Sequence, residues 1–137
     1  MNLAMLRVEG NDAELEALKQ ALPLEIEASW KQGQAMRRGT ASSSGFNATV
    51  ADSENPKQLV NAVREFLTEC GKRGVTFSTT HLTTELSIGI AVGDSTQFIA
   101  SVDFSPSDLK ALATLGIALS VTAYPTSDEA NDHDNNA

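Results

Sequence analysis

Gln97 to Pro125, QFIASVDFSPSDLKALATLGIALSVTAYP, is the stretch that decides the fold. Its first and last parts alternate apolar and polar residues, which predicts two strands, the first beginning near Gln97. Between them, Ser105 is suited to cap a helix that has Pro106 in its first turn and Asp108 near its free amides. Gly116 suits the left-handed residue that ends such a helix. The stretch therefore predicts a strand, a helix and a second strand.

The same reading predicts four more strands and two more helices in the rest of the chain. The expected strands are Leu3–Glu9, Leu24–Trp30, Phe46–Val50 and Thr84–Val92, and the expected helices run from Asn11 to Leu22 and from Pro56 to Cys70. Gly93 to Ser95 resemble a hairpin turn, so the strand that ends at Val92 and the strand that begins near Gln97 are expected to pair antiparallel. The order βαββαββαβ predicts an α+β fold, with a largely antiparallel sheet of about six strands and three helices packed on one face.

Length and composition indicate a single domain. The chain has 137 residues, of which 41% are hydrophobic, and no apolar run approaches the 18 residues of a membrane span. We expect one domain over residues 1–125, a disordered acidic tail over 126–137, and a cytoplasmic location. Cys70, the single cysteine, falls on the apolar face of a predicted helix and is expected to be a buried hydrophobic residue.

The formal net charge of −8 argues against a nucleic-acid partner and favours a basic one. Half of that charge comes from four acids of the tail, at positions 128, 129, 132 and 134, so the folded body is only modestly acidic.

One basic cluster with an aromatic residue interrupts this acidic sequence. Lys31, Arg37 and Arg38 follow Trp30 in a glycine- and serine-rich segment, Lys31–Gly45, that is expected to be an exposed, mobile loop. Cations beside an aromatic ring suit an anion or a nucleotide, although the segment contains neither phosphate-loop pattern. The alternative is that Trp30 is a buried core or interface residue.

The candidates for catalysis and metal binding are sparse. His81 and Glu85 would share a face only on a helix, which the threonine-rich context opposes. His133 lies between two aspartates in the predicted tail, which lacks the fixed geometry of a metal site. Ser42 to Ser44 have no strand-to-helix setting for a nucleophile. We therefore expect no catalytic residue, no metal site and no cofactor.

Two stretches together resemble a known family. They are the turn Trp30-Lys31-Gln32-Gly33 and the closing run with Phe104-Ser105-Pro106, Leu109, Leu115-Gly116, Leu119 and Tyr124-Pro125. With the opening strand and helix, they resemble the bacterial Domain of Unknown Function 4279 family over most of Leu3 to Pro125. The chain departs from that family's pattern at Phe46-Asn47, where a second tryptophan is usual. The resemblance implies a fold and supplies no reaction or cofactor.

Two hypotheses of function follow. The first is a non-enzymatic protein-binding module, in its most concrete form an immunity protein that neutralises a basic bacterial toxin, because acidic surfaces steer quickly onto basic partners. The alternative is a small-ligand or nucleotide-binding domain that uses the loop from Trp30 to Arg38. The sequence leaves the oligomeric state open.

Overall fold

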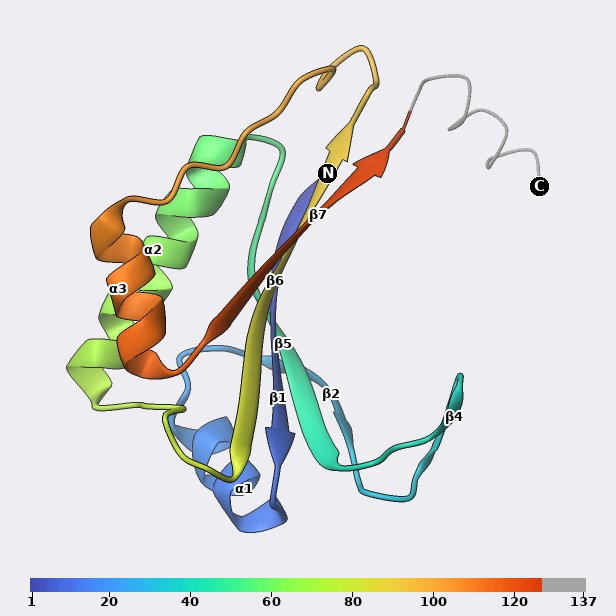
Figure 1. The fold of residues 1–137 in the computed structure, drawn as a ribbon, viewed down its shortest axis with the longest axis vertical. Helices are drawn as coiled ribbons and strands as arrows, with labels where there is room; N and C mark the ends of the chain where they lie inside the picture. The colour runs from blue at the N-terminus through green and yellow to red at the C-terminus, as the bar shows by residue number, and fades with distance from the viewer. Residues whose placement is uncertain (127–137) are drawn as a thin grey trace.

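The computed structural model describes residues 1–126 (Figure 1). Its three helices are α1 (Asp12–Ala21), α2 (Pro56–Arg73) and α3 (Pro106–Leu115). Its strands are β1 (Asn2–Gly10), β2 (Ile26–Trp30), β3 (Ala35–Met36), β4 (Gly39–Thr40), β5 (Ser44–Ser53), β6 (Leu82–Val92) and β7 (Ala118–Pro125). The predicted acidic tail lies, apart from Thr126, outside the described residues.

The main sheet has five strands in the order β2-β5-β1-β6-β7, and β3 and β4 form a separate two-stranded hairpin. The pairs β2–β5, β5–β1 and β1–β6 are antiparallel, whereas β6 and β7 are parallel. The predicted α+β class and largely antiparallel sheet are confirmed, with five strands in place of six. Figure 1 shows α2 and α3 side by side against the same face of this sheet.

The core lies between that face and the three helices. Alternate residues of β1 and β6 point into it, as expected for strands with one covered face. Its members include Ala4, Leu6, Val8, Leu15, Leu18, Phe46, Leu59, Val63, Phe66, Leu86, Ile88 and Leu112. Because residues from all three helices belong to this one cluster, the opposite face of the sheet is left without a helical cover.

The helix ends follow the sequence signals. Ser105 caps α3 and makes a capping box with Asp108, and Gly116 ends that helix with a φ of 80°. Asn55 caps α2, and Gly74 ends it in the left-handed conformation with a φ of 68°. The predicted ends of α3 are confirmed because capping depends on side chains within a few residues of the helix end.

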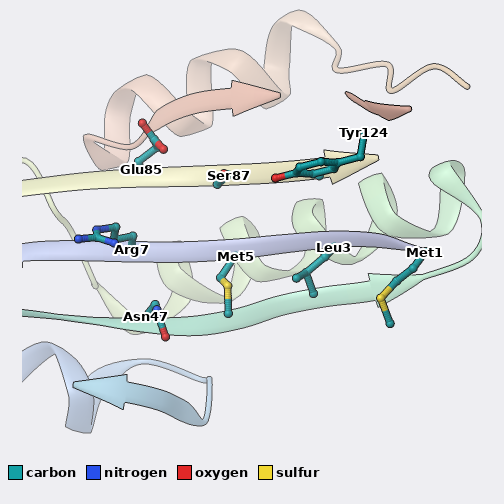
Figure 2. A pocket seen from close by; sticks show the side chains of 9 residues that line it. Met1, Leu3, Met5, Arg7, Asn47, Glu85, Ser87 and Tyr124 are labelled. Atoms are coloured by element: carbon teal, nitrogen blue, oxygen red, sulfur yellow. The ribbon is translucent and has the colours of Figure 1, made fainter. Parts of the chain in front are cut away.

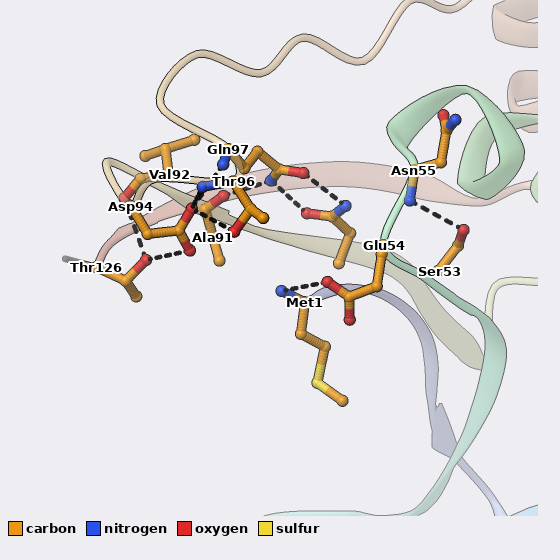
Figure 3. Close-up of polar contacts among 11 residues, drawn as sticks. Met1, Ser53, Glu54, Asn55, Ala91, Val92, Asp94, Thr96, Gln97 and Thr126 are labelled. Atoms are coloured by element: carbon orange, nitrogen blue, oxygen red, sulfur yellow. Dashed lines mark hydrogen bonds and ion pairs between the residues drawn. The ribbon is translucent and has the colours of Figure 1, made fainter. Parts of the chain in front are cut away.

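The strand predicted to begin near Gln97 is wrong, and so is its antiparallel pairing with β6. The Gln97 side chain bonds the Asn2 side chain in both directions, at 2.7 and 3.1 Å, and also donates to the Ala91 carbonyl (Figure 3). These bonds attach Gln97 to Asn2, the first residue of β1, and the chain then continues to α3. Val102 and Phe104 are partly buried against the core, whereas Phe98 is 75% exposed, so only the second half of the apolar alternation corresponds to packing and none of it to a strand ladder.

The predicted exposed loop from Lys31 to Gly45 contains regular structure. β3 and β4 pair through Ala35 with Thr40 and Met36 with Gly39, which makes Arg37 and Arg38 the two residues of the turn. Backbone bonds close the base of this hairpin: Gly33 donates to Ala41 at 2.8 Å, and Ala41 donates to Gln34 at 2.9 Å. The sequence missed the hairpin because its strands have only two residues each.

An ion pair between the half-exposed Arg64 and the buried Asp108 joins α2 and α3. Arg64 of α2 donates from Nε to Oδ1 and from Nη2 to Oδ2 of Asp108 at 2.8 Å each, and Asp108 is only 5% exposed. The bond from Arg64, followed by one from the Ser105 backbone amide, lowers the pKa of Asp108 far below its usual range. Asp108 therefore both caps α3 and connects it to α2.

Cys70 is buried in the core, as the sequence predicts. Its removal from water raises the pKa of the thiol to about 11. Because thiolate is the reactive form, we expect the native protein to be inert to a thiol-specific reagent at pH 7.5 and to react fully in denaturant. Absorbance of the released chromophore checks this, and rapid labelling of the folded chain would contradict the burial.

No helix within residues 1–126 is both long and apolar enough to cross a membrane.

Candidate functional site

The face of the sheet that the helices leave uncovered, called the open face below, carries the side chains of β1 that alternate with the core. Leu3, Met5 and Arg7 point to it, and on β6 so do Glu85 and Ser87, which lie directly opposite Arg7 and Met5 in the ladder. Apolar side chains at Leu3 and Met5 are unusual for a solvated sheet face, which normally alternates to polar residues.

The centre of the open face is a hollow of about 490 Å³, called the central hollow below. Its apolar lining consists of Met1, Leu3, Met5 and Tyr124, and its polar lining includes Arg7, Asn47, Glu85 and Ser87. Figure 2 shows the side chains of Met1, Leu3 and Met5 following one another along the line of β1, with Tyr124 lying along the neighbouring β6. The hollow is wide and open to one side.

Two aromatic rings on this face lie against glycines of the neighbouring strand. A side-chain carbon at Gly89 would meet the Tyr124 ring at 2.9 Å, and one at Gly45 would meet the Trp30 ring at 2.5 Å. Covering a strand glycine with an aromatic ring is a known way to stabilise a sheet. Trp30 is thereby buried, at 6% exposure, which agrees with the interface-or-core alternative from the sequence.

The lining of the central hollow contains one acid, Glu85, which lies opposite one base, Arg7. Further acids lie outside the lining on neighbouring strands: Asp52 lies opposite Leu3, and Glu27 accepts a 2.5 Å bond from Thr49. The amino terminus pairs with Glu54 at 3.4 Å (Figure 3). The charges in the lining therefore balance, and Asp52 and Glu27 add negative charge on the strands beside it.

A second hollow of about 490 Å³, the hairpin pocket, lies between β1 and the β3–β4 hairpin. Three of the four binding residues predicted from the sequence line it, namely Trp30, Arg37 and Arg38. Arg7 and Glu9 line it as well. The guanidinium of Arg7 lies over the Trp30 ring, 4.6 Å from its centroid. Sequence reasoning missed Arg7 and Glu9, although the alternation of the first strand places Arg7 away from the core.

Lys31, the fourth selected residue, does not line the pocket. Its ammonium lies 3.5 Å from Asp12, at the start of α1. A hydrogen bond with Ser44, and secondarily the charge of Lys31, lower the pKa of Asp12. Lys31 therefore faces α1 and not the hairpin arginines.

His81 and Glu85 do not form a joint site. His81 precedes β6, while Glu85 lies within it on the open face. Among residues 1–126, no three His, Cys, Asp or Glu side chains gather as a metal site would require.

Comparisons of the chain with protein-family models, curated proteins and solved structures gave no match. The resemblance to the Domain of Unknown Function 4279 family therefore stays a prediction from the residues named above.

Proposed function

We propose that the protein is a non-enzymatic binding module that docks a basic partner protein on the open face, and that the partner is a bacterial toxin which it neutralises. The single observation that supports this proposal is the central hollow, an apolar floor of Met1, Leu3, Met5 and Tyr124 on a sheet face that no helix covers. Apolar side chains that fill such a hollow supply affinity, and the acids of the neighbouring strands, Asp52 and Glu27, steer a basic partner.

The size of the open face also favours a protein partner. Five strands spaced about 4.8 Å apart and nine residues rising about 3.3 Å each give a face of roughly 24 by 30 Å, or about 700 Å². A standard protein interface buries about 800 Å² on each partner. The face therefore matches one side of such an interface.

The test compares two tagged variants with the wild-type protein. Met5→Arg places a bulky positive charge on the floor of the hollow, whereas Leu109→Arg makes a matched change on the exposed side of α3. A protein captured from the native host at low salt is identified, produced and titrated against all three. We expect Met5→Arg to weaken binding at least about tenfold and Leu109→Arg to leave it unchanged.

Growth and salt dependence complete the test. The captured protein, expressed alone, is expected to arrest growth, and co-expression of the wild type but not of Met5→Arg should restore it. Binding of the partner should weaken as the salt concentration rises, since the open face carries charged side chains. Capture that is indifferent to Met5→Arg would exclude the open face as the interface, and a harmless captured protein would exclude the immunity role.

A further inference from the structure

The hairpin pocket is a concentration of positive charge on an otherwise acidic protein. Arg7 reaches it from β1, and Arg37 and Arg38 reach it from the hairpin turn. We propose that this pocket binds the phosphate group of a small phosphorylated molecule. The site goes beyond the proposed function, since it uses the hairpin end of the open face and shares only Arg7 with the central hollow.

Arg7 is held in place before any ligand arrives. Its guanidinium stacks on Trp30 at 4.6 Å and donates one bond to Glu9 at 3.0 Å. Trp30 is itself fixed against the Gly45 backbone. A guanidinium has five N–H donors, so bonding to Glu9 leaves several for a ligand. Binding to a side chain already held in one position costs less conformational entropy than binding to a free one.

Arg37 and Arg38 supply the movable part of the site. Both are exposed, and neither forms an ion pair or a side-chain hydrogen bond with any residue between 1 and 126. A turn of two residues whose base is closed by backbone bonds keeps both side chains at one end of the pocket. Planar guanidinium groups match the geometry of phosphate oxygens.

The charges in the pocket match a phosphate ester. Three guanidinium groups against the carboxylate of Glu9 leave a net charge of +2. A phosphate monoester carries a charge of about −1.5 to −2 at pH 7. Nucleic acid fits less well, because its continuous backbone would extend beyond the pocket over Glu85, Glu27 and other acids of the face. Nor is Trp30 free to stack on a base, as it is buried under Arg7.

The experiment titrates the protein with glucose 6-phosphate, inorganic phosphate and glucose. Trp30, the only tryptophan, reports binding by fluorescence because Arg7 covers its ring, and calorimetry gives the affinity. We expect both phosphates to bind with a dissociation constant of about 1 mM or tighter, and glucose to give no response. Equal responses to glucose and its phosphate would overturn the proposal.

Two variants assign the binding to the pocket. The double change Arg37→Gln with Arg38→Gln is expected to weaken phosphate binding at least about tenfold, because charge-assisted bonds are lost. Lys31→Gln, in the same segment but outside the pocket, should change it less than about twofold. If the double variant and Lys31→Gln weakened phosphate binding equally, the attraction would be general electrostatics and not a site in the pocket. If the wild type bound no phosphate at a concentration of about 10 mM, the site would be excluded. Met5→Arg tests the protein partner separately, so the two proposals fail independently.

Discussion

An Arg64→Met variant is expected to lose about 2 kcal/mol of unfolding free energy at pH 7. Arg64 is 45% exposed, so the loss of its own contacts costs little free energy. Asp108, in contrast, is only 5% exposed and would remain as a buried carboxylate without its bidentate partner. Only the local bond from the Ser105 amide would still stabilise its charge. Since small domains have total stabilities of about 5–15 kcal/mol, this loss should be evident in urea unfolding followed by circular dichroism.

Arg73→Met is the matched control. Arg73 is exposed to a similar extent, 46% against 45% for Arg64, and also bonds a carboxylate, but that of Glu69 is 42% exposed. Water can replace the lost partner of Glu69, so we expect a change below about 1 kcal/mol. Equal losses in the two variants would contradict the explanation from burial.

The effect of Arg64→Met should also depend on pH in a defined direction. A carboxyl whose pKa is lowered by folding stabilises the fold above its unfolded pKa of about 4, and that contribution is lost as the pH falls below this value. Arg64 is the first cause of the lowered pKa of Asp108. The difference between wild type and variant should thus be largest above about pH 5 and shrink below pH 4.

A Gly45→Ala variant is expected to lose about 2 kcal/mol of unfolding free energy. The added carbon would meet the Trp30 ring at 2.5 Å and the Val8 carbonyl oxygen at 2.7 Å. The backbone of β1 cannot move away without breaking its ladder, so the Trp30 ring must shift and the overlying Arg7 with it. Tryptophan emission should change at the same time, and phosphate binding in the hairpin pocket should weaken.

Gly71→Ala supplies the control for this change. Gly71 lies within α2, and a carbon added there meets no other atom within 4 Å. Alanine is the better helix former, so this variant should gain up to about 1 kcal/mol, as measured by the same urea titration. If Gly45→Ala left the unfolding free energy unchanged, Trp30 would be loosely held, and Arg7 above it would not be fixed in position.

The sequence predicted best what is decided locally. Ser105 and Gly116 bound α3 because each acts on backbone groups within one turn. The segment after Gln97 has an equally regular pattern but no ladder. Its conformation is decided by a distant partner, Asn2, and by the core against which Phe104 packs, while Phe98 stays 75% exposed. Alternation of apolar residues therefore does not by itself establish a strand.

The candidate site was predicted in part for the same reason. Trp30, Arg37 and Arg38 are neighbours in sequence, so their grouping was visible. Arg7 joins them only because β1 and β2 pair with β5 on either side. The central hollow was not predicted from the sequence. Leu3 and Met5 nevertheless make the first strand apolar on both of its faces. Such two-sided strands indicate either burial between layers or a surface that awaits a partner.

The central position of β1 bears on how the polypeptide is made. β1 is synthesised before both of its neighbours in the sheet, and one of them, β6, begins only at Leu82. At roughly 5–20 residues per second, the nascent strand waits on the order of 4–14 s before that neighbour is synthesised. During this interval β5 can pair with one edge of β1, but the other edge of this apolar strand stays unpaired. An unpaired strand edge is a target for chaperones and a point at which slowed translation would favour aggregation.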